Sequence, residues 1–181
     1  MIEMEFTLIV STQRGRENDC ISELWYLLRE IGEEEGVYEK TGLPGLVIVK
    51  TKMDPFTVVE RLKEMADERP WEFHYVLKVT PIELNVKTDV EEIKEAVKKL
   101  LGKIGENESF RITVNKRATN LSSKEIIDEV AKLVDRKVNL ENPDKIIQIE
   151  IIGDYTGISV IKPDQILSIT KIKEEWMKKL R

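Results

Sequence analysis

The sequence predicts an α+β protein made of two domains, residues 1–80 and 81–181. Short apolar strands alternate with segments in which apolar residues recur every three or four positions, as in helices that bury one face. Gly or Pro residues mark the ends of several of these segments. No low-complexity linker interrupts the chain, so we expect the N-terminal domain to pack closely on the C-terminal one.

The first domain is predicted to have the element order β-α-β-β-α-β. Cys20, Leu24 and Leu28 lie at helical spacing and define the first helix. Asp54 and Pro55 are a strong start for the second helix, with Asp as the cap and Pro in the first helical position. The expected strands are residues 6–10, 37–40, 46–50 and 73–79. This order is the ferredoxin-like arrangement.

The second domain is predicted to contain two capped helices, several strands and a C-terminal helix. Asp89 caps the first helix, and Ser122 caps the second with Glu125 three residues later, as in a capping box. Residues 172–181 form a short amphipathic helix, and Gly153-Asp154 is the turn of a hairpin. The expected strands are residues 110–115, 137–140, 145–152 and 155–161.

The composition excludes most familiar catalytic chemistry. The chain has a single cysteine, Cys20, and a single histidine, His74. Structural zinc needs four such ligands, so we expect no metal and no other cofactor. Cys20 lies on the apolar face of a helix and His74 within an apolar predicted strand, so structural roles are favoured for both. No glycine-rich phosphate loop is present, and we predict that the chain is not an enzyme.

The predicted environment is the cytoplasm. No apolar run approaches the length of a membrane span, and the N-terminus carries acids where a signal peptide carries positive charge. The balance of Lys and Glu resembles that of proteins from hot environments. The net charge of −5 argues mildly against nucleic acid, although phosphate is bound by local patches rather than by the total charge.

Basic residues gather around the start of the helix that Ser122 caps. Lys116 and Arg117 end the preceding strand, and Lys124 lies in the first turn of the helix. A helix N-terminus presents free N–H groups and partial positive charge, which favour phosphate. A charged surface without a ligand explains the same spacing, so the pattern alone leaves both interpretations open. The candidate RNA-binding residues are Arg111, Lys116, Arg117, Ser122, Lys124, Arg136, Lys137, Asn142, Lys145, Lys162, Arg14 and Arg16.

Some of these candidates have simpler explanations. Asn142 and Pro143 are strong turn residues, and they serve a turn as readily as an RNA contact. Arg14 and Arg16, at the start of the first helix, equally suit a plain surface role. Tyr155 suits base stacking, but a half-buried strand tyrosine is the simpler interpretation.

The sequence resembles the THUMP domain over residues 110–117, 122–127 and 136–144 and the two strands that follow. The most specific element is Val138-Asn139-Leu140-Glu141-Asn142-Pro143-Asp144. The likeness covers roughly residues 81–170 and implies an RNA-binding module. Residues 10–17, Val-Ser-Thr-Gln-Arg-Gly-Arg-Glu, are similar to the opening of the archaeal and eukaryotic tRNA acetylation adaptor family.

That second resemblance implies a non-catalytic adaptor. The expected partners are tRNA, gripped at its acceptor stem and 3′ end, and a separate RNA acetyltransferase that forms N4-acetylcytidine. Two alternatives stay open. One is a small RNA-modifying enzyme with an undetected site, and the other is a module that binds only protein.

Overall fold

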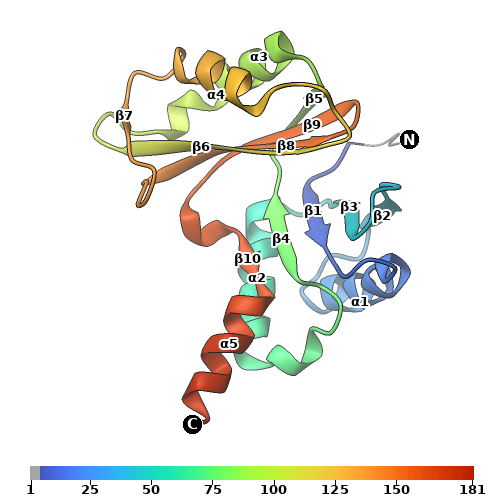
Figure 1. Ribbon diagram of the computed structural model, residues 1–181. Coiled ribbons are helices and arrows are strands. Elements are labelled where there is room, and N and C mark those ends of the chain that lie inside the picture. Colours follow the sequence, from blue (N-terminus) through green and yellow to red (C-terminus); the bar gives the residue numbers. More distant parts are fainter. Residues whose placement is uncertain (1–4) are drawn as a thin grey trace. The chain divides into compact units, whose positions relative to one another are not determined.

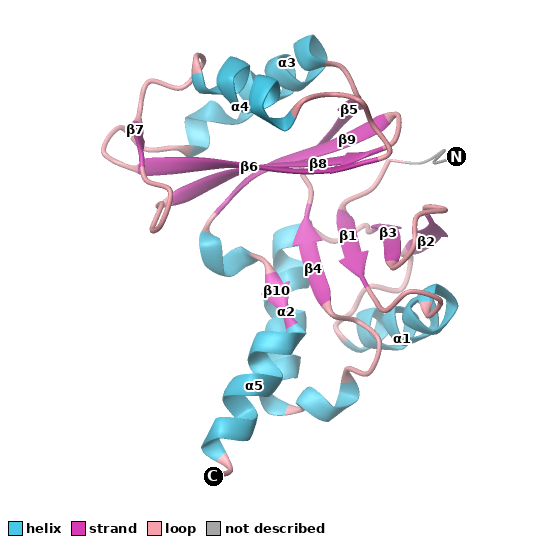
Figure 2. Cartoon of the chain, viewed as in Figure 1, coloured by secondary structure: helices cyan, strands magenta, loops and turns pink. Residues whose placement is uncertain are grey.

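A computed structural model describes residues 5–181, which fall into two compact units (Figures 1 and 2). The first unit combines the chain up to Pro81 with Gln165–Arg181, and the second is Ile82–Asp164. Each unit carries one five-stranded sheet, so the predicted α+β class is confirmed. Within the described residues, no helix has the length and apolar character needed to cross a membrane.

The first unit is a ferredoxin-like sheet with the strand order β10-β4-β1-β3-β2, in which all neighbours are antiparallel. Its strands are β1 (Leu8–Ser11), β2 (Val37–Lys40), β3 (Leu46–Lys50), β4 (Lys78–Pro81) and β10 (Leu167–Ser168). Its helices are α1 (Glu17–Glu30), α2 (Pro55–Glu68), the single turn η1 (Pro70–Glu72) and α5 (Ile169–Lys179). The predicted β-α-β-β-α-β order is confirmed, and its core lies between the sheet and α1 and α2.

The local start of α2 agrees with the sequence. The Asp54 carboxylate accepts a hydrogen bond from the Thr57 backbone N–H at 3.0 Å, and Pro55 occupies the first helical position. Because the cap satisfies one N–H that the helix leaves unpaired, it fixes where the helix begins. Val58 and Leu62 on the inner face of this helix are fully buried.

The prediction of a strand at residues 73–79 is wrong in its bounds. Regular pairing begins only at Lys78, and β4 continues to Pro81. The Glu23 carboxylate accepts the backbone N–H groups of His74, Tyr75 and Val76 at 2.7 to 2.9 Å. Those donors are therefore satisfied by a side chain from α1 and do not join the strand ladder.

The C-terminal segment also differs from the sequence-based division. The sequence places it in the second domain, whereas contacts place Gln165–Arg181 with the first unit. β10 pairs with β4, with Leu167 opposite Val79. α5 begins at Ile169, three residues before the predicted start, because Ser168 caps it by accepting from the Lys171 N–H.

The second unit has a mixed sheet with the strand order β5-β9-β8-β6-β7. Its strands are β5 (Leu84–Lys87), β6 (Ser109–Arg117), β7 (Lys137–Val138), β8 (Lys145–Ile152) and β9 (Tyr155–Ile161). Its helices are α3 (Val90–Leu100), α4 (Ser123–Ala131) and the single turn η2 (Leu101–Lys103); the turn η3 (Pro163–Gln165) follows β9. α3 and α4 lie on one face of this sheet (Figure 2).

The predicted bounds of β8 and β9 are confirmed to the residue, since the two strands are rich in isoleucine and share a tight glycine turn. β5 was not predicted: it has only four residues, and although Leu84 and Val86 alternate with Asn85 and Lys87, none of the four is fully buried. The strand predicted at residues 137–140 is only two residues long.

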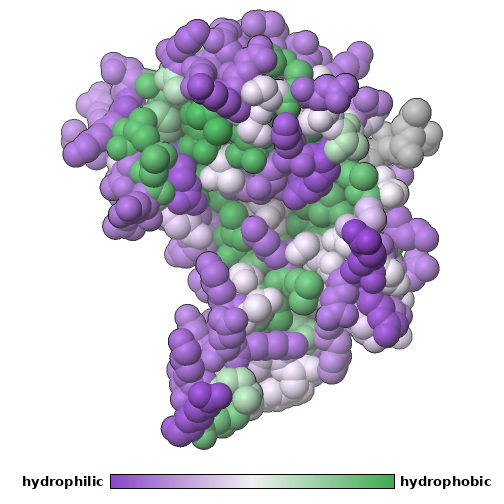
Figure 3. All heavy atoms as spheres, in the orientation of Figure 1, coloured by the Kyte–Doolittle hydropathy of each residue, from purple (hydrophilic) through white to green (hydrophobic). Residues whose placement is uncertain are grey.

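Polar side chains dominate the surface, as the 35% of charged residues requires. Hydrophilic side chains cover most of the face drawn in Figure 3, and apolar ones show in smaller areas. Trp25, Tyr26, Trp71 and Leu140 are among the large apolar side chains that stay exposed.

Candidate nucleic-acid interface

The end of β6 and the start of α4 form the first group of predicted site residues. Lys116 lies on the same face of the sheet as the helices, and its ammonium donates to the Leu121 carbonyl at 3.1 Å. Ala118 follows the strand with a φ of 56°, which turns the chain toward α4. This hydrogen bond therefore ties the strand end to the loop that delivers the helix.

The N-terminus of α4 is capped as predicted. Ser122 Oγ accepts from the Glu125 N–H at 3.3 Å, and the Lys124 side chain is exposed. Among the described residues, the Lys124 ammonium has no partner. A capped helix start still directs unpaired N–H groups outward, so Lys116, Lys124 and this helix end bring positive charge and hydrogen-bond donors together.

Arg117 lies on the opposite face of the sheet from Lys116, because neighbouring strand residues alternate. Its Nη2 pairs at 2.9 Å with Glu150, a carboxylate that is 2% exposed. Glu150 also accepts from Asn115 Nδ2 at 2.6 Å and from the Gln148 amide. Arg117 Nη1 is buried without a hydrogen-bond partner. Most of the Arg117 charge is therefore compensated inside the domain.

Sequence reasoning missed Glu150 and Gln148. The signal was present, because these two polar residues alternate with isoleucines along β8. Alternation places them on one face together with Thr113 and Asn115 of β6, away from α3 and α4. The sheet thus has an apolar face under its helices and a polar network on the other face.

The remaining predicted residues of this unit gather near the other end of β6. Arg111 lies six residues before Arg117, a separation of roughly 20 Å along a strand. Its Nη1 donates to the Leu140 carbonyl at 2.9 Å. Arg136 donates to the carbonyls of Ile104 and Gly105 and of its neighbour Asp135. These arginines therefore hold loops as well as presenting charge.

Lys145 and Asn142 have structural partners at this same end. Lys145 Nζ contacts the Lys103 carbonyl at 2.7 Å and Glu108 at 2.8 Å. The Asn142 N–H donates to the Asn139 side chain at 3.0 Å, which is turn chemistry. Lys137 and Lys162 are exposed, and Lys137 has no side-chain partner within residues 5–181.

Arg14 and Arg16 belong to the first unit, before α1. Arg16 pairs with Asp19 at 3.0 Å and lies over the Tyr75 ring at 5.8 Å. Arg14 is exposed. Tyr155, the candidate for base stacking, is half-buried at the start of β9.

The two residues considered for catalysis have different environments. Burial raises the pKa of the Cys20 thiol to about 12, so a thiolate does not form near neutral pH. His74 does not lie in an apolar strand, which is a correction: it is exposed in the bend before β4. Within the described residues, no group of three His, Cys, Asp or Glu side chains is arranged to hold a metal ion.

The pairing of Glu108 with Lys145 makes the stability of the protein depend on pH. Hydrogen bonds from Lys145 and from the Gly105 N–H lower the pKa of Glu108 below the ordinary value of 4.5 for a glutamate. A depressed folded-state pKa stabilises the protein above the unfolded pKa, and this contribution is lost as pH falls through the folded value. We expect Glu108→Gln to be destabilised at pH 7, and the difference from wild type to shrink below pH 4.5 in urea unfolding. The exposed neighbour Glu106→Gln is the control, and a difference that does not change with pH would contradict the assignment.

Most of the second unit matches a known protein family. Residues 87–161 match the sequence profile of the THUMP domain family. They run from the end of β5 through β9 and include both helices of the second unit.

The second unit therefore resembles a THUMP domain over these residues.

The THUMP domain contains nine of the twelve predicted site residues; Lys162 lies one residue beyond it, and Arg14 and Arg16 lie in the other unit. An uncharacterized protein of Methanocaldococcus jannaschii, MJ0421, is 24% identical over 170 residues, covering 91% of this chain and 43% of that protein.

Solved structures share the fold. PH1313 of Pyrococcus horikoshii has a TM-score of 0.60 at 20% identity, over 87% of this chain and 55% of that one. A 4-thiouridine synthetase, solved with RNA and ATP, has a TM-score of 0.54 at 18% identity, over 91% of this chain and 42% of that one. This chain spans about half of the length of these relatives or less.

Proposed function

We propose that this chain is a tRNA-binding adaptor that presents tRNA to a separate modifying enzyme. The observation that carries the proposal is a THUMP domain in which Lys116 and Lys124 lie beside the capped start of α4. The 4-thiouridine synthetase that shares this fold was solved with RNA bound, which supports RNA as the ligand.

The cations of this domain lie on both faces of its sheet, and those at the start of α4 form one group. Lys116 and Lys124 lie at one end of β6, whereas Arg111 lies near the other end. A-form RNA is contacted mainly through its shape, sugars and phosphates, and its phosphates repeat along both strands. Because strand alternation places Arg111 on the opposite face of the sheet from Lys116, a duplex bound at the start of α4 meets Lys116 and Lys124 but not Arg111.

The non-catalytic part of the proposal rests on the chemistry of the described side chains. Cys20 is buried with a raised pKa, His74 is exposed in a bend, and the described residues include no group of three side chains arranged to hold a metal ion. The similarity of residues 10–17 to the tRNA acetylation adaptors makes an N4-cytidine acetyltransferase the proposed partner.

The first test removes the two cations at the start of α4. We expect Lys116→Gln/Lys124→Gln to weaken tRNA binding roughly tenfold near physiological salt. The slope of log affinity against log salt should fall by about 2, because two phosphate contacts are lost. Fluorescence anisotropy with labelled tRNA across a salt series measures both quantities.

The matched control is Lys99→Gln/Lys132→Gln, which removes the same charge from exposed positions on α3 and just after α4. This control should change affinity less than twofold if local charge matters more than total charge. Equal losses in the two double variants would contradict a site at the start of α4. Arg117 is left intact, because its removal would leave Glu150 buried without its cation.

The second test separates adaptor from enzyme. We expect purified chain and tRNA alone to yield no modified nucleoside by mass spectrometry. Adding a cytidine acetyltransferase and acetyl donor should produce N4-acetylcytidine faster with the chain than without it. Modification by the chain alone would overturn the adaptor proposal in favour of an enzyme.

A further inference from the structure

The apolar stripe of α5 is covered at the start of the helix and uncovered at its end. The stripe consists of Ile169, Ile172 and Trp176 and of Leu180, which caps the helix. These residues are three or four positions apart, so they lie on one side of the helix. Ile169 belongs to the core of the first unit, and Ile172 packs against that core. Leu180 is 63% exposed, so the stripe continues beyond the part of the unit that covers it.

Two more apolar side chains widen the uncovered end. Met177 is 54% exposed, and Trp71 of η1 is 55% exposed. The rings of Trp71 and Trp176 approach edge to face with 6.0 Å between their centroids, so η1 and the last turns of α5 share one surface. Adjacent exposed apolar side chains mark interaction surfaces, whereas single ones need no explanation. We refer to Trp71, Trp176, Met177 and Leu180 as the α5 tip.

Cations surround the α5 tip. Four exposed basic residues of this segment form no ion pair within residues 5–181: Lys171, Lys178, Lys179 and Arg181. Residues 169–181 contain five basic and two acidic residues, which gives a side-chain charge of +3 in a chain whose total is −5. The end of α5 therefore combines exposed apolar groups with unpaired positive charge.

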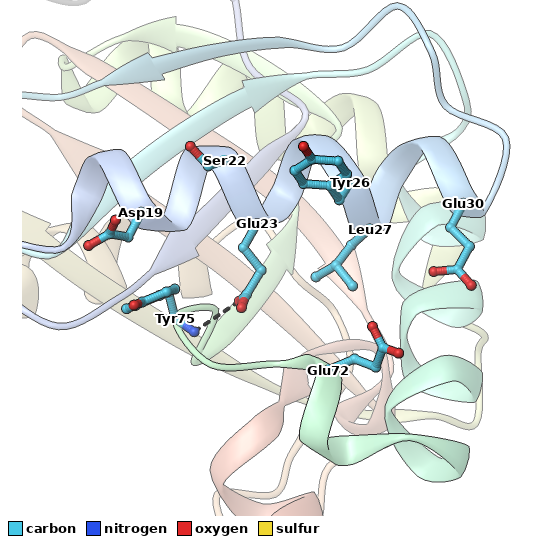
Figure 4. Close-up of a pocket in the computed structure, with 8 residues that line it drawn as sticks. All are labelled: Asp19, Ser22, Glu23, Tyr26, Leu27, Glu30, Glu72 and Tyr75. Atoms are coloured by element: carbon cyan, nitrogen blue, oxygen red, sulfur yellow. Dashed lines mark hydrogen bonds between the residues drawn. The ribbon is translucent and has the colours of Figure 1, made fainter.

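The carboxylate-lined hollow beside α1 differs from the α5 tip, because its groups are satisfied within the chain. This hollow of about 370 Å³ lies between α1 and the segment that follows α2 (Figure 4). Glu30 and Glu72 share Arg69 at 2.8 and 3.4 Å. Glu23 accepts the Tyr75 N–H, as the dashed line in Figure 4 shows. At the α5 tip, the described part of the chain supplies no such partner for the cations.

These features favour a protein over RNA as the occupant of the α5 tip. Met177 and Leu180 carry no ring on which a base could stack, and RNA presents mainly phosphates and sugars. Aliphatic side chains gain free energy when another apolar surface removes them from water. Amphipathic helices bind proteins by laying an apolar face into a groove. Unpaired cations beside that face fit a groove whose rim is acidic.

We propose that the α5 tip inserts into an apolar groove with an acidic rim on the modifying enzyme. The assignment of the groove to that enzyme rests on the proposed function. The adaptor then binds RNA at the start of α4 in the second unit and the enzyme through the end of α5 in the first unit. Each ligand therefore has its own surface on the chain.

Binding of the full chain to a cytidine acetyltransferase tests the α5 tip. We expect Met177→Gln/Leu180→Gln to weaken this binding about tenfold, since two exposed apolar side chains lose their contacts with the groove. Glutamine favours a helix nearly as well as the residues that it replaces, so α5 should stay folded. Lys178→Gln/Lys179→Gln/Arg181→Gln should weaken binding about threefold at low salt, through loss of contacts with the acidic rim. Isothermal titration calorimetry measures both changes.

The matched control is Val138→Gln/Leu140→Gln, which replaces two apolar side chains that are similarly exposed in the second unit. This control should change affinity for the acetyltransferase less than twofold. Equal weakening by the two double variants, or no weakening by Met177→Gln/Leu180→Gln, would overturn the docking site.

Two other occupants have their own signatures. Met177→Gln/Leu180→Gln that weakens tRNA binding but not acetyltransferase binding would assign the α5 tip to RNA. A wild-type dimer that the same variant converts to a monomer in sedimentation equilibrium would assign it to a second copy of the chain. Either result would overturn the proposal.

The same assay distinguishes this proposal from the proposed function. If wild type and Met177→Gln/Leu180→Gln speed acetylation equally at limiting enzyme, the docking site at the α5 tip fails alone. If wild type neither binds the acetyltransferase nor speeds acetylation, the proposed function fails, and the docking site fails with it.

Discussion

Glu150→Ala is expected to lower the free energy of unfolding by about 3 kcal/mol, because it breaks a buried ion pair from one side. The carboxylate is 2% exposed and accepts hydrogen bonds from Arg117, Asn115 and Gln148. Its loss leaves a guanidinium and two amides without an acceptor inside the domain. Urea unfolding followed by circular dichroism measures the change.

A double variant tests whether the unpaired Arg117 causes this loss of stability. Arg117→Met/Glu150→Leu removes both partners and fills the space with apolar side chains, so we expect it to regain most of the lost stability. Exposed Glu125→Ala controls for the loss of a carboxylate from the same domain. A loss below about 1 kcal/mol for Glu150→Ala would show that water satisfies Arg117 and its neighbours.

This network also explains why the candidate site was only partly predictable. The sequence places Lys116 and Arg117 side by side, and charge counting treats them as one patch. Strand alternation sends them to opposite faces, and Glu150, which lies 33 residues after Arg117, takes up one of the two charges. A partner that far along the chain is visible only once β6 and β8 are known to be parallel neighbours.

Local signals were sufficient where one segment decides its own structure. The caps at Asp54, Asp89 and Ser122 are all confirmed, since each depends on a side chain that bonds an N–H three residues later. The hairpin of β8 and β9 depends on two isoleucine-rich strands and a glycine with positive φ at Gly153.

Long-range contacts decided the elements that were missed or predicted wrongly. β10 is two residues long and exists only through its pairing with β4. The strand was predicted to begin at residue 73 because this segment is apolar, and Phe73 and Val76 are indeed buried. The N–H groups of residues 74–76 bond to the Glu23 carboxylate and not to a neighbouring strand. Neither contact leaves a trace in the local pattern.

Removal of the Glu23 carboxylate is therefore the second change that we expect to lower the free energy of unfolding strongly. Glu23→Ala removes three hydrogen bonds to a carboxylate, and each such bond contributes about 1.5–3 kcal/mol. Water reaches part of this segment, since His74 is exposed, so we expect a total loss of about 3 kcal/mol rather than the full sum. Glu23→Gln keeps an acceptor oxygen and should lose roughly half as much.

Hydrogen exchange shows whether this loss comes from the proposed contacts. The amides of His74, Tyr75 and Val76 should exchange faster in Glu23→Ala, while those of β1 and β3 keep their protection relative to global unfolding. Ser22→Ala, at an exposed neighbouring position on α1, is the matched control and should leave these three amides unchanged. Unchanged exchange at residues 74–76 in Glu23→Ala would mean that the backbone of this segment is held by its buried side chains, Phe73 and Val76, and not by the carboxylate.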